Sequence, residues 1–229
     1  MRVILFDIDG TLLRTGAGRR SMERALTATF GTSGDPSYRY DGKTDRQIIR
    51  ETMRMAGFDD ATIDERRAAT EARYVAELRI EVETAASTAV LLPGVRELVS
   101  AVAAHERMVL GLLTGNVADG AAIKLRAVGL DPLAFVVGAF GSDHEVRAEL
   151  PAIAQARAAA HLARAVAGEA CVIIGDTPAD IQCGRGIGAR TIGVATGRYP
   201  RHELATHAPH AVFDDLSDTA AVLATLERC

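Results

Sequence analysis

Short apolar runs, most of them separated by longer helix-like stretches, are the feature that most constrains the fold of this chain. The runs cover residues 3–6, 108–113, 135–137, 171–174, 191–194 and 211–213. Continuous apolar runs of this length are typical of strands buried on both faces. Such strands, alternating with helices, indicate a parallel sheet. The pattern therefore predicts an α/β fold with a Rossmann-like, doubly wound parallel sheet.

Residues 15–88 interrupt this pattern after the first predicted strand. They contain no comparable run, and apolar residues recur instead at helical spacing, for example at Met22, Leu26 and Phe30. Residues 31–42 are rich in turn-forming types and predict the loop between the first two helices. We therefore predict two domains, an α/β core from residues 1–14 and 89–229 and an inserted helical domain from residues 15–88.

Composition narrows the possible partners. The 229 residues carry a formal net charge of -4 without a basic block, so neither nucleic acid nor an anionic membrane is an expected partner. No apolar stretch approaches the roughly 18 residues of a membrane span, and the N-terminus lacks a signal peptide's apolar region. The three cysteines show no metal-ligand spacing. We expect a cytoplasmic protein with reduced thiols and no membrane partner.

Polar residues follow three of the predicted strands. Ligands of an open parallel sheet bind outside the carboxyl ends of its strands. The residues at these ends are Asp7 and Asp9, then Thr114, Gly115 and Asn116, then Asp176, with Asp180 four residues later. Carboxylates that converge from separate strands repel one another and need a cation, and hard oxygen ligands suit Mg²⁺. The sequence therefore predicts a Mg²⁺ site.

Three of these segments carry a family resemblance. DIDGT at 7–11, LLTGN at 112–116 and IIGDTPADI at 173–181 resemble the signature segments of the haloacid dehalogenase superfamily. The helical insert and the LLPGV segment at 91–95 resemble the subgroup with an α-helical cap, which includes phosphoglycolate phosphatase and β-phosphoglucomutase. The resemblance implies phosphoryl transfer through an aspartyl-phosphate intermediate, which is nucleophilic catalysis by a carboxylate. Of the reactions in this subgroup, we expect Mg²⁺-dependent hydrolysis of a small phosphate monoester, as in phosphoglycolate phosphatase.

The resemblance assigns roles to the residues after the first strand. Asp7 corresponds to the nucleophile, and Asp9 to the residue that protonates the leaving group and later activates water. Mg²⁺ is held in the family by the equivalents of the Asp7 side chain, the Asp9 main-chain carbonyl and the Asp176 side chain. Gly10 permits the chain to coil at this point. Thr11, Arg14 and Gly16 are expected at the hinge between core and cap.

Further roles follow for the later segments. The Thr114 hydroxyl and the Gly115 backbone N–H are expected to hold phosphate oxygens, and Asn116 to orient the loop or the cap beside the substrate. Arg147 stands where the family usually has a lysine followed by proline. Lys124 is its rival, but it lies well along a helix and is expected to face solvent. Asp180 would hold a metal-bound water or orient Arg147.

The helical insert contains candidate substrate contacts. Lys43, Thr44 and Asp45 precede a predicted helix, at the place where helical-cap relatives present residues to the substrate. Thr44 has a simpler interpretation, because threonine is a favoured N-cap residue. The side chains of the cap decide which ester is cleaved, so the sequence predicts only a small phosphorylated metabolite.

Three other functions share this pattern. A dehalogenase needs neither Mg²⁺ nor the second aspartate, so Asp9 and Asp176 argue against it. A phosphomutase of the β-phosphoglucomutase type shares every core residue and stays open. A catalytically silent phospho-ligand-binding protein on the same fold also stays open, although such proteins usually lose the nucleophile or the metal aspartate. The sequence allows either a monomer or a homodimer.

Overall fold

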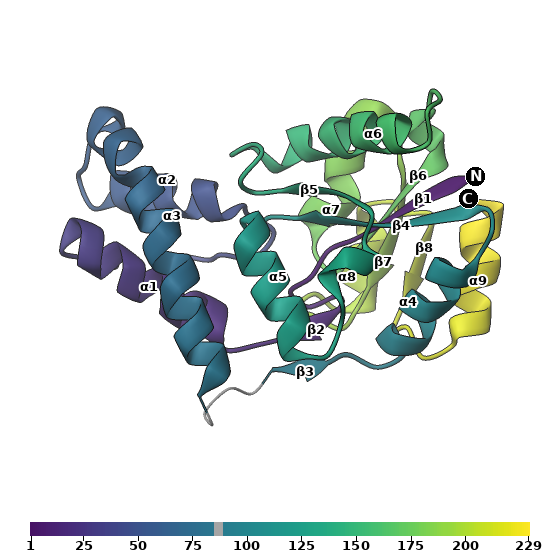
Figure 1. Ribbon diagram of the computed structural model, residues 1–229, viewed down its shortest axis with the longest axis horizontal. Coiled ribbons are helices and arrows are strands. Elements are labelled where there is room, and N and C mark those ends of the chain that lie inside the picture. The colour runs from purple at the N-terminus through teal and green to yellow at the C-terminus, as the bar shows by residue number, and fades with distance from the viewer. Residues whose placement is uncertain (85–88) are drawn as a thin grey trace.

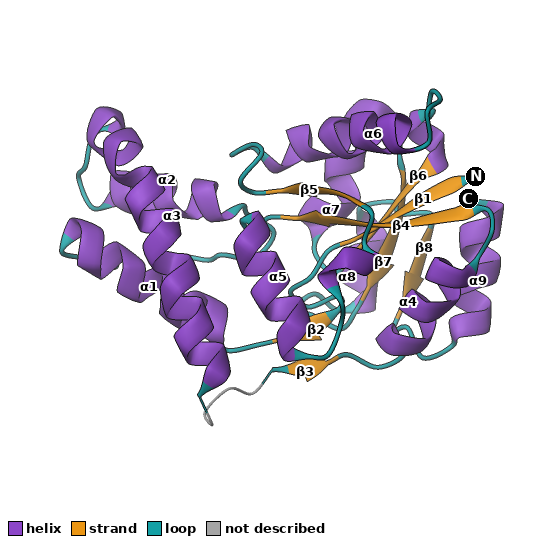
Figure 2. Ribbon diagram, viewed as in Figure 1, coloured by secondary structure: helices purple, strands orange, loops and turns teal. Residues whose placement is uncertain are grey.

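The computed structural model of the protein describes residues 1–84 and 89–229. Within them, six parallel strands form one sheet in the order β5-β4-β1-β6-β7-β8, and β2 pairs with β3 in a separate antiparallel ribbon (Figure 2). The strands are β1 (Arg2–Phe6), β2 (Leu13–Arg14), β3 (Val90–Leu91), β4 (Met108–Thr114), β5 (Val137–Phe140), β6 (Cys171–Gly175), β7 (Arg190–Val194) and β8 (Ala211–Phe213). This sheet confirms the predicted α/β fold class.

Helices cover both faces of the six-stranded sheet (Figure 1). They are α4 (Val95–Ala104), α5 (Ala118–Ala127), α6 (Leu150–His161), α7 (Pro178–Cys183), α8 (Arg201–Thr206) and α9 (Thr219–Arg228). Side chains alternate along a strand, so Ile4 and Phe6 pack toward α4, α5 and α9 whereas Val3 and Leu5 pack toward α6. Both faces of β1 are therefore apolar, as its continuous apolar run predicts.

Three further helices lie together beside the sheet, at the left of Figure 1. They are α1 (Ala17–Phe30), α2 (Asp45–Met55) and α3 (Asp60–Glu83). Met22, Ile49 and Leu78 belong to a hydrophobic cluster that is separate from those of the sheet. This cluster also includes Val117, just before α5, and Ile123 in α5. We call these three helices and their loops the cap. The predicted boundary at residue 88 lies outside the described residues, and the division into two domains stays a prediction.

The two described ends of the cap join the core side by side. β2 lies just before the cap and β3 just after it, and Leu13 pairs with Leu91 and Arg14 with Val90. Arg14 also donates a hydrogen bond from Nη2 to the Thr196 carbonyl, at 2.7 Å. This ribbon fixes the point at which the cap leaves the core.

Two expected elements differ from the structure. Of the run at 135–137, only Val137 belongs to a strand. The Phe135 N–H donates to the Pro132 carbonyl in the turn at Pro132–Ala134, and pairing with β4 begins at Val137. The alanine-rich segment at 152–170 predicts a packed amphipathic helix, but the α-helix ends at His161. Ala163 there adopts the left-handed conformation, with φ 51°, which ends the helix.

No helix in the described part of the chain combines the length and apolar character required to cross a membrane.

Candidate active site

The carboxyl ends of β1, β4 and β6 bring the predicted polar residues to one edge of the sheet. β1 lies between β4 and β6, so its end is where the connections depart in opposite directions. Asp7 follows β1, Thr114 ends β4 and Asp176 follows β6. Such a switch point is the usual ligand site of a doubly wound sheet.

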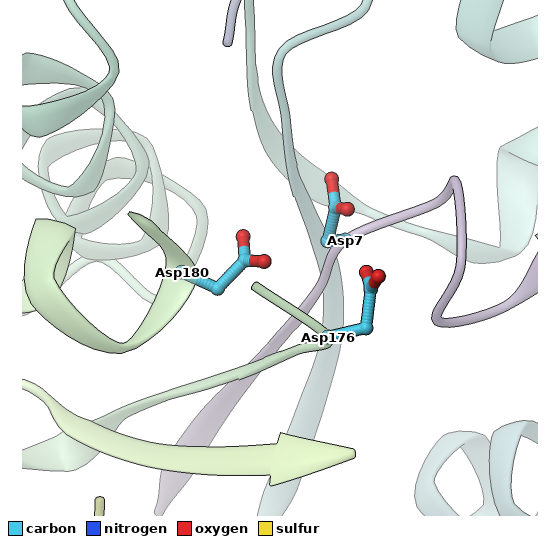
Figure 3. A group of neighbouring side chains, drawn as sticks. All are labelled: Asp7, Asp176 and Asp180. Carbon is cyan, nitrogen blue, oxygen red and sulfur yellow. The ribbon is translucent and has the colours of Figure 1, made fainter. Parts of the chain in front are cut away.

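Asp7, Asp176 and Asp180 form a buried carboxylate cluster (Figure 3). Each offers an oxygen atom that lies within 4.8 Å of the others. Burial raises the pKa of Asp7 to about 7, against the opposing effect of Arg147. The pKa of Asp176 is raised well above its ordinary value by burial and by the charges of Asp180 and Asp7. A cation at this site would relieve the repulsion.

Arg147 is the one described basic side chain in contact with this cluster. Its Nη2 lies 3.1 Å from Asp7 Oδ1 and also donates to Asp180 Oδ1. Burial lowers the pKa of Arg147, but the attraction of Asp180 and Asp7 outweighs burial and raises it. Its Nε is buried without a partner among the described residues. The guanidinium therefore remains charged and holds the nucleophile candidate and its neighbour together.

Asp180 is fixed by the start of α7. Thr177 and Asp180 form a capping box, in which Asp180 Oδ2 accepts from the Thr177 N–H at 2.9 Å and from the Thr177 hydroxyl at 2.6 Å. Both Asp180 oxygens are thus used by Thr177 and Arg147. Of the two roles predicted for Asp180, orientation of Arg147 is the one that these contacts support. Sequence reasoning missed Thr177, although a threonine three residues before an acidic residue signals such a cap.

The oxygens left free in this cluster fit a hard cation. Within residues 1–84 and 89–229, no hydrogen-bond donor contacts Asp176 Oδ2 or the Asp9 main-chain carbonyl. A Cβ on Gly10 would lie 2.3 Å from Asp176 Oδ2, and a Cβ on Gly197 only 1.7 Å from it. The two glycines let the backbone enclose this carboxylate. The set of oxygen donors and the tight surroundings suit Mg²⁺.

Two residues near Asp176 have roles that the sequence did not reveal. The Thr11 hydroxyl donates to Asp176 Oδ1 at 3.1 Å, so Thr11 positions a carboxylate in addition to standing near the expected hinge. Thr196 donates from its hydroxyl to the Gly10 carbonyl at 2.6 Å and precedes Gly197. The loop after β7 therefore completes the site. That loop carries no carboxylate, histidine or cysteine, so the search for reactive groups at strand ends gave no signal for it.

Asp9, Thr114 and Asn116 form a second polar group at the same edge. Asn116 Nδ2 donates to Asp9 Oδ2 and to Thr114 Oγ1, both at 2.8 Å. Thr114 Oγ1 also accepts from the Asn116 N–H at 3.3 Å, so its own proton is available to a ligand. The Gly115 N–H donates to no described residue. Thr114 and Gly115 therefore offer two donors to an anion, and Asn116 orders the loop.

The expectation that Lys124 faces solvent is wrong. Its side chain is 4% exposed, and its Nζ donates to Asp9 Oδ2 at 2.7 Å and to Asn116 Oδ1 at 2.6 Å. Lys124 lies one helical turn after Gly120 and Ala121, which are both buried, so it occupies the inner face of α5. Two acceptors draw the ammonium group inward and compensate for its burial.

These residues face a cavity of about 200 Å³ between the core and the cap. The core contributes Asp7, Asp9, Thr114, Gly115, Asn116, Lys124, Arg147, Asp176 and Thr177. The cap side contributes Thr15, Gly18, Arg19, Met22, Tyr40, Asp41, Gly42, Lys43, Asp45, Ile48 and Tyr74. One wall is therefore rich in carboxylates and hydrogen-bond donors, and the other mixes aromatic, aliphatic and basic groups.

The three cap candidates have different surroundings. The amine of Lys43 is paired with Glu51 at 2.5 Å and donates to the Tyr38 hydroxyl at 2.6 Å. Thr44 is the N-cap of α2, which confirms the simpler of its two interpretations. Its hydroxyl also donates to the Glu145 carbonyl at 2.6 Å. Thr44 is fully buried and lies outside the cavity lining. These contacts do not support its predicted contact with substrate.

Asp45 joins the cap to the core. Its Oδ2 accepts from the Val117 N–H at 2.8 Å, and its own N–H donates to the Gly115 carbonyl at 2.7 Å. Burial raises the pKa of Asp45 to about 7, against the opposing charge of Lys124. A Cβ on Gly115 would lie 2.1 Å from the Lys43 carbonyl oxygen, so the two backbones meet directly. Residues 42–45 thus dock against the loop that follows β4.

A family model described as HAD-hydrolase-like matches residues 149–219, which include Asp176 and Asp180. No curated protein matches the chain by sequence. Together with the fold, the family match confirms the resemblance to haloacid dehalogenase-like hydrolases. The matched model is that of a hydrolase, as predicted.

Solved structures with the same fold cover nearly the whole chain. A hydrolase from Pseudomonas syringae has 21% identity and a TM-score of 0.73, with 98% of each chain covered. CbbY from Rhodobacter sphaeroides, in complex with phosphate, has 24% identity and a TM-score of 0.72, with 99% of each chain covered. A predicted phosphoglycolate phosphatase from Haemophilus somnus 129pt has 18% identity and a TM-score of 0.69, with 97% of this chain and 98% of that chain covered.

Proposed function

We propose that the protein is a Mg²⁺-dependent phosphatase that hydrolyses a small phosphate monoester through an aspartyl-phosphate intermediate. One observation carries this proposal. Asp7, at the switch point of the sheet, lines the cavity between core and cap while Arg147 holds one of its oxygens. The solved structures with this fold add support, because one of them contains phosphate and another is a predicted phosphoglycolate phosphatase.

Asp7 is the nucleophile in this proposal. Its Oδ1 contacts Arg147, which leaves Oδ2 to attack phosphorus. The bond from phosphorus to the ester oxygen breaks as the bond from Oδ2 to phosphorus forms, and the phosphoryl group moves to Asp7. Water then attacks the same phosphorus atom and releases inorganic phosphate, which restores the carboxylate.

Asp9 transfers the protons. It lies two residues after Asp7 and lines the same cavity. In the first step its carboxyl group gives a proton to the departing ester oxygen, and in the second it takes a proton from the attacking water. The alcohol and the phosphate leave in turn, and Asp9 ends in its starting form.

Three donors hold the phosphoryl oxygens. Arg147 supplies a fixed charge, and the Thr114 hydroxyl and the Gly115 N–H supply the neutral donors described above. Donors fixed before the reaction stabilise the charge that develops in the transition state. Asp7, Asp176 and the Asp9 carbonyl would hold Mg²⁺, which when bound neutralises charge on the phosphoryl group.

The cap limits the substrate to a small metabolite. The cavity holds about 200 Å³, and residues 42–45 close one side of it against the core. A macromolecular ester would not fit under this wall. The three cysteines are free and buried, which agrees with the reducing interior of a cell and with a cytoplasmic location.

Phosphate release from a panel of esters tests the proposal. The panel holds phosphoglycolate, several sugar phosphates and p-nitrophenyl phosphate, with Mg²⁺ or with EDTA. Mg²⁺-dependent turnover of one ester well above the others, absent in Asp7→Asn, supports it. Conversion of one hexose phosphate isomer into another without net phosphate release would favour the phosphomutase. Neither reaction with any ester would favour the silent phospho-ligand-binding protein.

A further inference from the structure

Lys124 is a buried charge that the proposed reaction does not use. It is 4% exposed, at the inner face of α5, and Asp9 and Asn116 are its described polar contacts. A buried ion pair is weak evidence for stability, because the cost of removing both charges from water offsets their attraction. Its position beside Asp9 therefore points to a role in the site.

The contacts around Lys124 fix one oxygen of Asp9. Asp9 Oδ2 accepts hydrogen bonds from Lys124 Nζ at 2.7 Å and from Asn116 Nδ2 at 2.8 Å. Lys124 Nζ also donates to Asn116 Oδ1 at 2.6 Å. The three side chains form a closed triangle. Asp9 Oδ1 has no donor among the described residues, so it is the oxygen left for the reaction.

The cap meets the amine from the opposite side. A Cβ on Gly18 of α1 would lie 3.1 Å from Lys124 Nζ, which is tighter than ordinary contact. Gly18 therefore leaves room for the ammonium group, and Tyr74 of α3 lines the same part of the cavity. The cap therefore packs against the Lys124 amine, whereas the Asp9 side chain remains 43% exposed and accessible from the cavity.

We propose that Lys124 is a positioning residue for Asp9. This proposal rests on the proposed function, because Asp9 is the proton donor there. With Oδ2 tied to Lys124 and Asn116, the proton moves to and from Oδ1. It passes to the ester oxygen as the bond to phosphorus breaks, and it returns from water in the second step. Lys124 keeps its own protons throughout.

Single-turnover release of two leaving groups separates this role from a general structural one. An alkyl phosphate needs its leaving oxygen protonated, whereas p-nitrophenolate departs without a proton. Lys124→Met should slow release of the alkyl alcohol about a hundredfold, the lower range for loss of acid catalysis, and slow p-nitrophenol release much less. Equal slowing with both esters would overturn the proposal.

Two further variants serve as a control and as a replacement for Lys124→Met. Arg126→Met removes an exposed basic residue from the same helix and should leave both rates unchanged. Lys124→Gln keeps a donor without the charge and replaces Lys124→Met if circular dichroism shows that the latter does not fold. It should show the same dependence on leaving group.

Crystal structures of the wild-type protein and the Lys124 variant supply a readout that does not depend on turnover. The Asp9 carboxyl should keep its contact with Asn116 in the wild type and lose it in the variant. An unmoved Asp9 in the variant would overturn the positioning role. Wild-type protein that cleaves neither ester would count against the phosphatase alone, and the two crystal structures would still decide the role of Lys124.

Discussion

The core wall of the cavity and its cap wall are built from different kinds of contact. On the core wall, carboxylates from separate strands lie together, and Arg147 is the one described cation that contacts the cluster around Asp7. On the cap wall, charges are paired locally, as in Lys43 with Glu51 and Arg19 with Glu23. The core wall therefore keeps a repulsion among clustered carboxylates that a ligand can relieve. On the cap wall, the buried Asp45 carboxylate instead accepts a hydrogen bond from the Val117 N–H. We therefore propose that the reaction takes place at the core wall and that the cap wall selects the substrate.

Loss of the nucleophile should be the largest effect. Asp7→Asn keeps the shape of the side chain but removes the attacking oxygen, so phosphate release should fall at least about a thousandfold. The measurement is initial rate on the best ester of the panel, with circular dichroism to verify the fold. Asp119→Asn, an exposed change in α5, serves as control and should keep full activity. Substantial activity in Asp7→Asn would show that Asp7 is not the nucleophile.

Removal of Arg147 should harm both activity and stability. Arg147→Ala leaves two buried carboxylates without their cation, which costs about 3–5 kcal/mol in the free energy of unfolding. Denaturant unfolding in EDTA measures this cost. The exposed pair of Arg201 and Asp214 offers the contrast, and Arg201→Ala should cost less than about 1 kcal/mol. A similar loss of unfolding free energy in the two variants would mean that the buried carboxylates need Arg147 no more than the exposed Asp214 needs Arg201.

A methyl group on Gly115, where the loop after β4 meets residues 42–45, should displace those cap residues more than it destabilises the fold. Gly115→Ala would place a Cβ 2.1 Å from the Lys43 carbonyl, so residues 42–45 must move away. We expect KM to rise about tenfold, the effect of roughly 1.4 kcal/mol in binding. Gly186→Ala is the matched control, because a Cβ there meets nothing within 4 Å. An unchanged KM in Gly115→Ala would argue that the cap wall does not contact substrate.

Thr44 distinguishes a helix cap from a substrate contact. Thr44→Val removes the N-cap bond to Gln47 and the bond to the Glu145 carbonyl, so the free energy of unfolding should fall about 1–2 kcal/mol. Thr44→Ser keeps the hydroxyl and should retain most of that stability. The pattern to look for in denaturant unfolding is a difference between these two variants. A large rise in KM in both, without loss of stability, would restore the substrate contact.

The smallest effect concerns pH and the cap wall. Bonds from Lys43, Tyr38 and Gln47 outweigh burial and lower the pKa of Glu51 from 4.5 to about 2. A lowered pKa means stability that is present above pH 4.5 and is lost as pH falls toward 2. The side chain is 37% exposed, so the contribution should stay below about 1 kcal/mol. Glu51→Gln should flatten the fall in unfolding free energy over this range, and an unchanged pH profile would contradict the pairing.

The core wall was more predictable from sequence than the cap wall, for a physical reason. Asp7, Thr114 and Asp176 stand at ends of apolar strands, and parallel strands bring such ends together whatever the other side chains are. The contacts of Lys43 and Thr44 depend on how α2 docks against the core, which local sequence does not encode. Gly197 lies against Asp176 but was missed, because only its lack of a side chain matters.

Lys124 shows where a default expectation failed. Lysine is rarely buried without a partner, so solvent exposure is the natural prediction for a lone lysine in a helix. The helical spacing pointed the other way, since Gly120, Ala121 and Leu125 place position 124 on the inner face. The partners that make this burial possible, Asp9 and Asn116, lie in the loops that follow β1 and β4. A periodicity argument could have found the face but not the partners.

Identification of the phosphorylated residue decides whether Asp7 is the nucleophile. The best ester is mixed with excess protein and Mg²⁺, quenched in acid within the first turnover and digested with trypsin. Cleavage after Arg2 and Arg14 leaves Asp7 and Asp9 in one peptide, and fragmentation by mass spectrometry tells them apart. If Asp7 is the nucleophile, the wild type carries phosphate on Asp7 and Asp7→Asn carries none. Phosphate on Asp9, or on a residue outside this peptide, would contradict it.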